Sequence, residues 1–247
     1  MSVYRIRDII SKNVYTKALF AFFCIVLLIL YFKAFFTTGV YFDDSFLKKE
    51  VLASDSHYIG KSAHGSIHIT VKGLKNKHGS AEVIYRLPNN INKRYTVNFK
   101  NAGNWDMGIE NIKDEAGNIV FEGEYRKDSN FLYDKDGKPM ISDAVRIRAN
   151  GEKVSYNANY RVSLKSVADF ASFAKDTVHG KFELLFLAIV LFTITIIDIK
   201  FPLFFFSLRH ALHVKDPEPS DFYIEMQRAT WIVLPIIGVL LMIAAII

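Results

Sequence analysis

Three long apolar segments constrain the fold of this chain more than any other feature of its sequence. They occupy residues 18–40, 182–203 and 229–247. A helix rises about 1.5 Å per residue and the hydrocarbon layer of a bilayer is about 30 Å thick, so roughly 20 apolar residues can cross it. The sequence therefore predicts a membrane protein with three transmembrane α-helices, one in each of these segments.

Charged residues beside these segments predict the orientation of the helices. The tail over residues 1–17 carries four basic residues and one acidic residue. Because basic flanks stay on the cytoplasmic side of a membrane, we expect a cytoplasmic tail and a first helix that is an uncleaved signal anchor. Lys33 lies near the outer end of this helix, where its long side chain can reach the interface. Residues 41–180 and the C-terminus are then extracytoplasmic.

The second apolar segment is interrupted near its end by Asp198, Lys200 and Pro202. A charge at the bilayer centre costs about 2.5–3.5 kcal/mol on insertion scales, whereas a charge near the interface costs much less. We therefore expect Asp198 and Lys200 to mark the inner boundary of the helix. Pro202 then turns the chain along the inner surface, into a cytoplasmic loop with an interfacial helix over residues 204–228.

Between the first two apolar segments the hydrophobic pattern has a period of two. Apolar residues alternate with polar ones over residues 67–71, 83–87, 95–99, 119–125 and, most regularly, 154–164. Such alternation is typical of antiparallel sheets with one buried face. The sequence predicts an extracytoplasmic β-sandwich or open-barrel domain over residues 41–165, inserted between the first and second helices. Residues 43–62 give no clear pattern.

After this domain the pattern changes to a helical one. Val167, Phe170, Ala174 and Val178 recur at helical spacing. They predict an amphipathic juxtamembrane helix over residues 166–180, and we expect it to lie on the outer membrane surface.

Three histidines in a short stretch are candidate metal ligands. Residues four apart share a face of a strand, so His64 and His68 could bind zinc or copper if His57 folded over them. His68, however, belongs to the polar side of an alternating strand, where a solvated histidine is the ordinary interpretation. We expect no metal or other cofactor here, and metal binding by the three histidines is the alternative.

The linker before the third apolar segment resembles one found in a group of bacterial proteins. Its sequence is Lys-Asp-Pro-Glu-Pro-Ser-Asp over residues 215–221. It resembles the K-D-x-E-P-S-[D/E] loop that joins two helices in uncharacterised small bacterial membrane proteins, and the resemblance extends over residues 200–247. Pro219 ends the preceding segment and Ser220 predicts the N-cap of the next helix. The resemblance implies a bacterial plasma (inner) membrane protein and no particular activity.

No arrangement of residues typical of an enzyme is found. The HExxH, GxSxG, P-loop and dinucleotide-binding motifs are absent from the sequence. The net charge of +6 is spread over the polar segments without a long basic run, so we expect no nucleic-acid partner. The helices are expected to lie in a lipid bilayer. The exported domain is expected to bind or position a protein partner or an envelope component without catalysis, or the chain forms a homo-oligomer. The alternative is a subunit of an oligomeric transporter or channel that uses Asp198 and Lys33.

Overall fold

The computed structural model describes residues 14–73, 79–100, 108–141, 156–157, 159–210 and 218–247. The chain forms two compact units, which we call the helical unit and the sheet domain. The helical unit consists of Met1–Phe36 and His179–Ile247, and the sheet domain of Thr37–Val178. Residues 1–13 of the predicted N-terminal tail and 215–217 of the linker before the third helix lie outside the described residues.

The sheet domain is built on one nine-stranded antiparallel sheet with the strand order β11-β1-β2-β3-β4-β5-β6-β7-β8. From β1 to β8, each strand pairs with its neighbour in sequence, and a separate two-stranded sheet joins β9 to β10. The bounds of the strands are β1 Thr38–Phe42, β2 Ser45–Leu52, β3 Asp55–Ser62, β4 Gly65–Lys72, β5 Ser80–Leu87, β6 Ile91–Phe99, β7 Ile109–Lys113, β8 Ile119–Glu122, β9 Glu124–Tyr125, β10 Leu132–Tyr133 and β11 Thr177–Val178.

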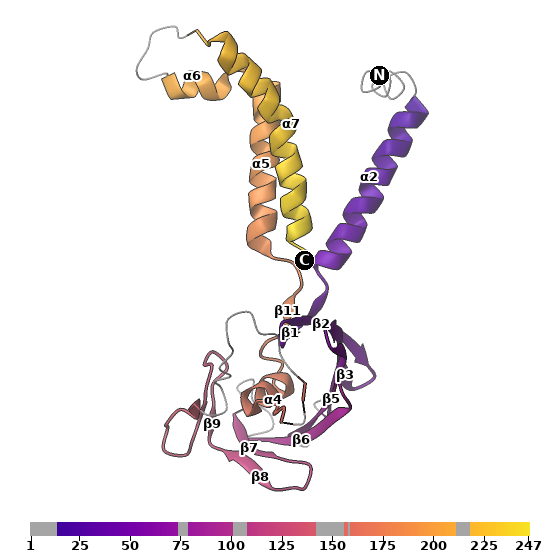
Figure 1. Ribbon diagram of the computed structural model, residues 1–247, viewed down its shortest axis with the longest axis vertical. Coiled ribbons are helices and arrows are strands. Elements are labelled where there is room, and N and C mark those ends of the chain that lie inside the picture. The colour runs from indigo at the N-terminus through magenta and orange to yellow at the C-terminus, as the bar shows by residue number, and fades with distance from the viewer. Residues whose placement is uncertain (1–13, 74–78, 101–107, 142–155, 158, 211–217) are drawn as a thin grey trace. The chain divides into compact units, whose positions relative to one another are not determined.

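The core of the sheet domain lies between one face of the sheet and the short helix α4, Leu164–Ala171. The alternating residues that predicted the strands supply this face: Ile67, Val83 and Val97, for example, are fully buried. Figure 1 shows the sheet curving around α4. Phe170 of α4 packs its ring against Tyr85. The predicted antiparallel sheet between the first and second apolar helices is therefore confirmed.

The first strands of the sheet correct the predicted end of the first helix. Helix α2, Val14–Phe35, ends before residue 40, and the chain enters β1 at Thr38. Apolar residues here serve the sheet instead of the membrane, because Phe42 packs in the core of the sheet domain. Asp43 and Asp44 both have positive φ angles and form the two-residue turn to β2, as short hairpins with right-handed twist require.

The amphipathic segment after the sheet is also corrected. Instead of a helix over residues 166–180, the structure has the shorter α4, and β11 follows at Thr177. Val167 and Phe170 are buried in the sheet-domain core. The prediction of a helix on the membrane surface is wrong, because the curved sheet provides the apolar partner that the helix needs.

The most regular alternation in the sequence, over residues 154–164, has no strand among its described residues. Its last residue, Leu164, begins α4. Tyr160 N donates to Asn157 O at 2.9 Å, so the chain turns here. The Asn157 side chain accepts from the backbone N–H of Asn159, and such bonds compete with a strand. The alternation still predicts correctly which of these side chains are buried, since Tyr156 is buried while Asn159 is exposed.

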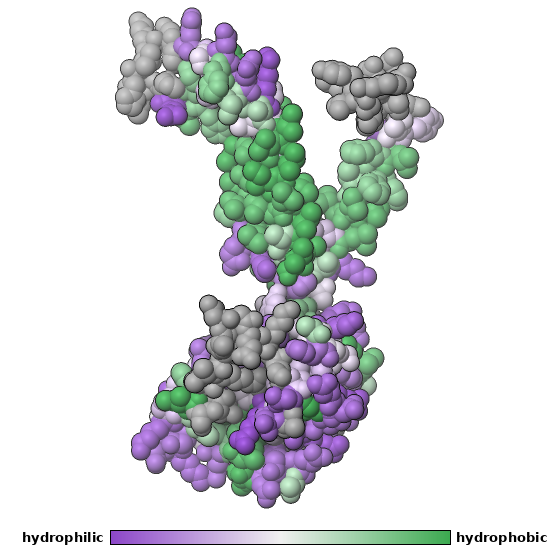
Figure 2. Space-filling model, viewed as in Figure 1, coloured by the Kyte–Doolittle hydropathy of each residue, from purple (hydrophilic) through white to green (hydrophobic). Residues whose placement is uncertain are grey.

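The helical unit contains three helices that are long and apolar enough to cross a membrane. They are α2, α5 Phe182–Lys200 and α7 Asp221–Ala244, and the short α6, Phe204–His210, lies between the last two. Figure 2 shows apolar side chains over these long helices and polar ones over the sheet domain. α7 begins eight residues before the predicted start at 229. Its first two turns contain charged and polar residues, so they do not belong to the apolar segment from which the helix is predicted.

Close contacts hold the helices of this unit together. Gly238 of α7 faces Phe192 of α5 so closely that a Cβ atom would lie 2.8 Å from the ring. Gly180 lies so close to the Phe35 ring that a Cβ atom would clash with it, and its N–H donates to Phe35 O at 2.9 Å. Lys181 N donates to Ala245 O at 2.9 Å. The C-terminal ends of α2 and α7 therefore meet the N-terminal end of α5.

Candidate functional site

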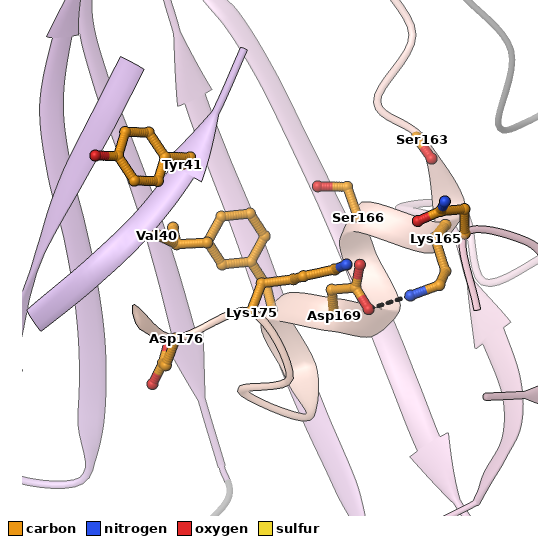
Figure 3. Close-up of a pocket in the computed structure, with 10 residues that line it drawn as sticks. Val40, Tyr41, Ser163, Lys165, Ser166, Asp169, Lys175 and Asp176 are labelled. Atoms are coloured by element: carbon orange, nitrogen blue, oxygen red, sulfur yellow. Dashed lines mark hydrogen bonds and ion pairs between the residues drawn. The ribbon is translucent and has the colours of Figure 1, made fainter. Parts of the chain in front are cut away.

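A cavity of about 570 Å³ lies beside α4 in the sheet domain. This volume is within the range of about 300–1,000 Å³ that is usual for ligand pockets. Figure 3 shows Lys165 and Asp169 of α4 directed toward each other, with Ser166 and Lys175 beside them, whereas the Tyr41 hydroxyl of β1 points away from this group. The lining residues are Val40, Tyr41, Asn130, Ser163, Lys165, Ser166, Asp169, Phe170, Lys175 and Asp176.

One side of the cavity is an ion pair that α4 itself forms. Lys165 and Asp169 are four residues apart on the helix, which places their side chains on one face, and they form a buried salt bridge. Tyr125 from β9 donates to Asp169 Oδ1 at 2.9 Å, and Ser172 Oγ donates to the Tyr125 hydroxyl at 3.0 Å. The Lys165 amine also lies 4.7 Å from the centre of the Tyr125 ring. Lys175 extends toward the same carboxylate in Figure 3.

Burial changes the pKa values of Lys165 and Tyr125. Loss of water lowers the pKa of the Lys165 amine, and the neighbouring Asp169 carboxylate only partly compensates. Burial also raises the pKa of the Tyr125 phenol above its ordinary value. The phenol therefore stays a hydrogen-bond donor to Asp169 throughout the neutral range.

A second fixed carboxylate lies at the other side of the cavity. Asp176 forms a salt bridge with Lys49 of β2 and accepts a hydrogen bond of 2.7 Å from the Tyr58 hydroxyl. The Lys49 amine lies 3.9 Å from the centre of the Phe173 ring. Burial, and then the bond to Asp176, raise the pKa of Tyr58. The two carboxylates of the cavity are thus held by donors from different elements, which is a preorganised polar surface.

Sequence reasoning missed these residues. Lys165 and Asp169 lie at an i, i+4 spacing among the apolar residues that predict an amphipathic helix. This charged pair lies on roughly the opposite side of the helix from Val167 and Phe170, where the sequence pattern is that of an ordinary solvated face, so no local signal marked the pair as buried. Asp176 could not be found from local sequence either, because its partners come from β2 and β3.

The structure brings two of the three predicted histidines together and separates the third. His57 Nδ1 and His68 Nε2 are 3.1 Å apart on the face of the sheet opposite the core. His64 belongs to the turn between β3 and β4, where its ring lies 6.0 Å from that of Tyr156. Burial, and then the nearby His57 and Arg86, lower the pKa of His68. Within the described part of the chain, no group of three His, Cys, Asp or Glu side chains is placed to hold a metal.

In the helical unit, Asp198 joins two helices. Its side chain is 8% exposed. Its Oδ1 accepts from Gln227 Nε2 and its Oδ2 from Trp231 Nε1, each at 2.7 Å. Gln227 and Trp231 are four residues apart on α7, so both reach α5 from one face. The carboxylate is therefore a contact between α5 and α7.

Lys33 lies at the other end of this unit. It is in the last turn of α2, close to the contact between Phe35 and Phe182 at the start of α5. Asp198 is 16 residues farther along α5, or about 24 Å at the rise of a helix. The two charges do not form a pair in the structure.

The end of α5 and the N-cap of α7 are found at the predicted residues, although α7 itself begins before the predicted start at 229. α5 ends at Lys200, where a cation interacts favourably with the negative end of the helix dipole. Pro202 lies in the turn before α6. Pro219 immediately precedes the N-cap of α7. The Ser220 side chain accepts from Tyr223 N at 3.2 Å, so the prediction of Ser220 as N-cap is confirmed.

Comparison with known proteins gives one family. Residues 187–245 match the model of a family of unknown function (DUF6199). No curated protein and no solved structure matches the chain. The matched segment belongs entirely to the helical unit, so the chain is similar to this family from α5 to α7 and not in the sheet domain.

Proposed function

We propose that this chain is a multi-pass bacterial plasma-membrane protein that displays the sheet domain outside the cell as a binding module without catalytic activity. The length and apolar surface of α2, α5 and α7 support three membrane crossings. The connectivity supports one orientation. The chain leaves α2 for the sheet domain and returns to α5 at the same end of the helical unit as the C-terminus, and the basic N-terminal tail marks the opposite side as cytoplasmic.

Cysteine labelling in intact cells tests this orientation. Cys24 is the only cysteine, so a Cys24→Ala chain is a cysteine-free background. A cysteine at the exposed Asn157 should react with a membrane-impermeant maleimide, and a cysteine at the exposed Glu218 should react only after permeabilisation. The opposite result would invert the proposed topology, and reaction of both positions in intact cells would refute a crossing by α5.

The charged cavity beside α4 carries the proposal of binding. Each of its carboxylates is held by two fixed donors and Lys165 is held in an ion pair, so the lining suits recognition better than proton transfer. We propose that it receives a short polar segment of a protein partner, whose backbone and charged groups match the lysine, carboxylate and hydroxyl groups of the wall. Buried ion pairs contribute little to the stability of a fold, because the loss of water offsets the attraction between the charges. Their presence in the cavity wall therefore supports a role in recognition.

Site-specific photocrosslinking in the full chain tests this binding. A photoreactive amino acid at Lys175, on the cavity wall, should capture one partner protein in living cells. The same amino acid at the exposed Lys135, elsewhere on the sheet domain, is the matched control. The Lys165→Met/Asp169→Leu variant removes the ion pair while keeping side chains of similar size, and should abolish the product at Lys175.

Two outcomes would contradict the proposal. One is a set of crosslinked products that is the same at Lys175 and Lys135. The other is a product at Lys175 that survives in the double variant although its melting temperature shows a folded sheet domain. The transport alternative is less well supported, because both oxygens of Asp198 are occupied by α7.

A further inference from the structure

Three polar atoms meet on the outer face of the sheet, outside the cavity. The register between β3 and β4 places His57 opposite Thr70 and Ile59 opposite His68, so His57, His68 and Thr70 share one face. His57 Nδ1 is 3.1 Å from His68 Nε2 and 3.2 Å from Thr70 Oγ1, and the last two atoms are 3.3 Å apart. The three atoms form a nearly equilateral triangle.

At most two protons serve the three contacts of this triangle. A neutral imidazole has a proton on only one ring nitrogen, and a hydroxyl has one proton. When one of the two facing nitrogens carries its proton, the other must be an acceptor. The third contact has no proton of its own and is a hydrogen bond only if one N–H or O–H is shared between two acceptors. Thr70 is only 6% exposed at this position.

The dimensions of the triangle fit the ligand shell of a four-coordinate metal ion. Zinc bonds to nitrogen or oxygen are about 2.0–2.1 Å long, so neighbouring ligand atoms around a tetrahedral ion are about 3.3–3.4 Å apart. The observed separations of 3.1, 3.2 and 3.3 Å need little expansion to reach this value. An ion above the plane of the triangle accepts a lone pair from each of the three atoms at once.

We propose that His57 Nδ1, His68 Nε2 and Thr70 Oγ1 bind a divalent first-row transition-metal ion, Zn²⁺ or Cu²⁺, and that solvent completes the coordination. Imidazole is a preferred ligand of both ions, whereas Mg²⁺ and Ca²⁺ require oxygen ligands. The site differs from the sequence expectation in one ligand, since Thr70 takes the place that the spacing gave to His64. It is independent of the cavity beside α4.

Charged neighbours on both sides influence this site. Glu50 of β2 is opposite His57 and is the nearest carboxylate on that side, where it now pairs with Lys48. Arg86 of β5 is opposite His68 and carries the same charge as the ion. The exposed Glu50 side chain offsets Arg86, and release from Lys48 would let it approach the ion.

Metal titration of the tag-free full chain in detergent tests the proposal. Zn²⁺, competed with a chromophoric chelator, should bind at one site, and Mg²⁺ should not displace it. Loss of an outer-shell partner already weakens metal binding about 10–100-fold, so His57→Ala and His68→Ala should each weaken this site at least as much. His64→Ala, which removes a nearby imidazole outside the triangle, is the matched control and should leave the affinity unchanged.

A spectroscopic measurement on the unmodified protein keeps the test decisive if a variant does not fold. Cu²⁺ bound at one equivalent should give an electron paramagnetic resonance spectrum with coupling to two imidazole nitrogens. A spectrum without this coupling, or no binding of either ion, would overturn the proposal. So would a zinc affinity that falls in His64→Ala and stays the same in a folded His57→Ala/His68→Ala chain.

Discussion

Replacement of Asp198 by alanine should weaken the packing of α5 against α7 more than any other single replacement of a polar residue on α5. The carboxylate accepts two hydrogen bonds of 2.7 Å, and its removal leaves Gln227 and Trp231 without their acceptor in an apolar setting. Side-chain hydrogen bonds between membrane helices contribute up to about 1.7 kcal/mol each, so the loss of two gives about 3 kcal/mol. This corresponds to a change of about 100-fold in the equilibrium between the packed and separated helices.

Fluorescence of Trp231 reports this equilibrium directly. The chain has two tryptophans, so a Trp105→Phe background leaves only Trp231. The protein is titrated with sodium dodecyl sulfate from mild detergent micelles, and the free energy of unfolding is extrapolated to zero denaturant for the background, Asp198→Ala, Gln227→Ala and the double variant. Because Gln227 has no acceptor left after Asp198→Ala, the double variant should lose clearly less than the sum of the single losses.

Thr193→Ala is the control for this measurement. Its hydroxyl donates only to Ile189 O of the same helix and it is exposed, so we expect a change below about 0.5 kcal/mol. If Asp198→Ala changes the free energy no more than Thr193→Ala does, Asp198 does not join the two helices. Additive losses for Asp198→Ala and Gln227→Ala would equally refute the contact.

The sheet domain and the start of α7 give three further predictions. Phe170→Ala empties the centre of the core and should destabilise the domain by about 3–5 kcal/mol, measured by thermal unfolding of the full chain. Burial raises the pKa of Tyr58, Tyr85 and Tyr125, so these phenols keep their protons in the folded state while the unfolded chain loses them above about pH 10. Stability should then fall by about 1.4 kcal/mol per pH unit for each phenol, followed by circular dichroism. Ser220→Ala should cost about 0.5–2 kcal/mol in the detergent titration, and Ser220→Gly only a few tenths.

The end of α5 and the N-cap of α7 could be predicted because local chemistry determines them. A cation in the last turn at Lys200, a proline in the following turn and a serine N-cap at Ser220 act within a few residues of their own position. The same is true of the strands β4, β5 and β6, where apolar residues recur at every second position along most of the buried face. In these segments the sequence pattern and the tertiary contacts agree.

The first hairpins of the sheet could not be predicted from their own pattern. In β3, the inward positions include Ser56 and Gly60, while Ile59 points outward and is 42% exposed. Pairing with β2 and β4 on both sides forms this strand in spite of its weak alternation. Only the Asp43-Asp44 turn was a local signal, since aspartate tolerates the positive φ angles found there.

The charged cavity and the histidine pair depend on contacts that sequence spacing does not contain. An amphipathic helix fits a membrane surface and the concave face of a sheet equally well, so the pattern around Phe170 could not distinguish them. His64 and His68 share a spacing of four, but the two-residue turn of the hairpin contains His64 and the register brings His57 to His68 instead. Such pairings follow from the hairpin register and not from distance along the chain.

The paired ends of the sheet domain have a consequence for how such proteins arise. Thr38 is opposite Val178 in the pairing of β1 with β11, and Gly180 N donates to Phe35 O. An insertion whose two ends lie this close can be gained, lost or exchanged by recombination without moving the flanking helices. We therefore expect chains that keep the hairpin of α5 and α7 and carry a different inserted domain, or none, between residues equivalent to Phe36 and His179.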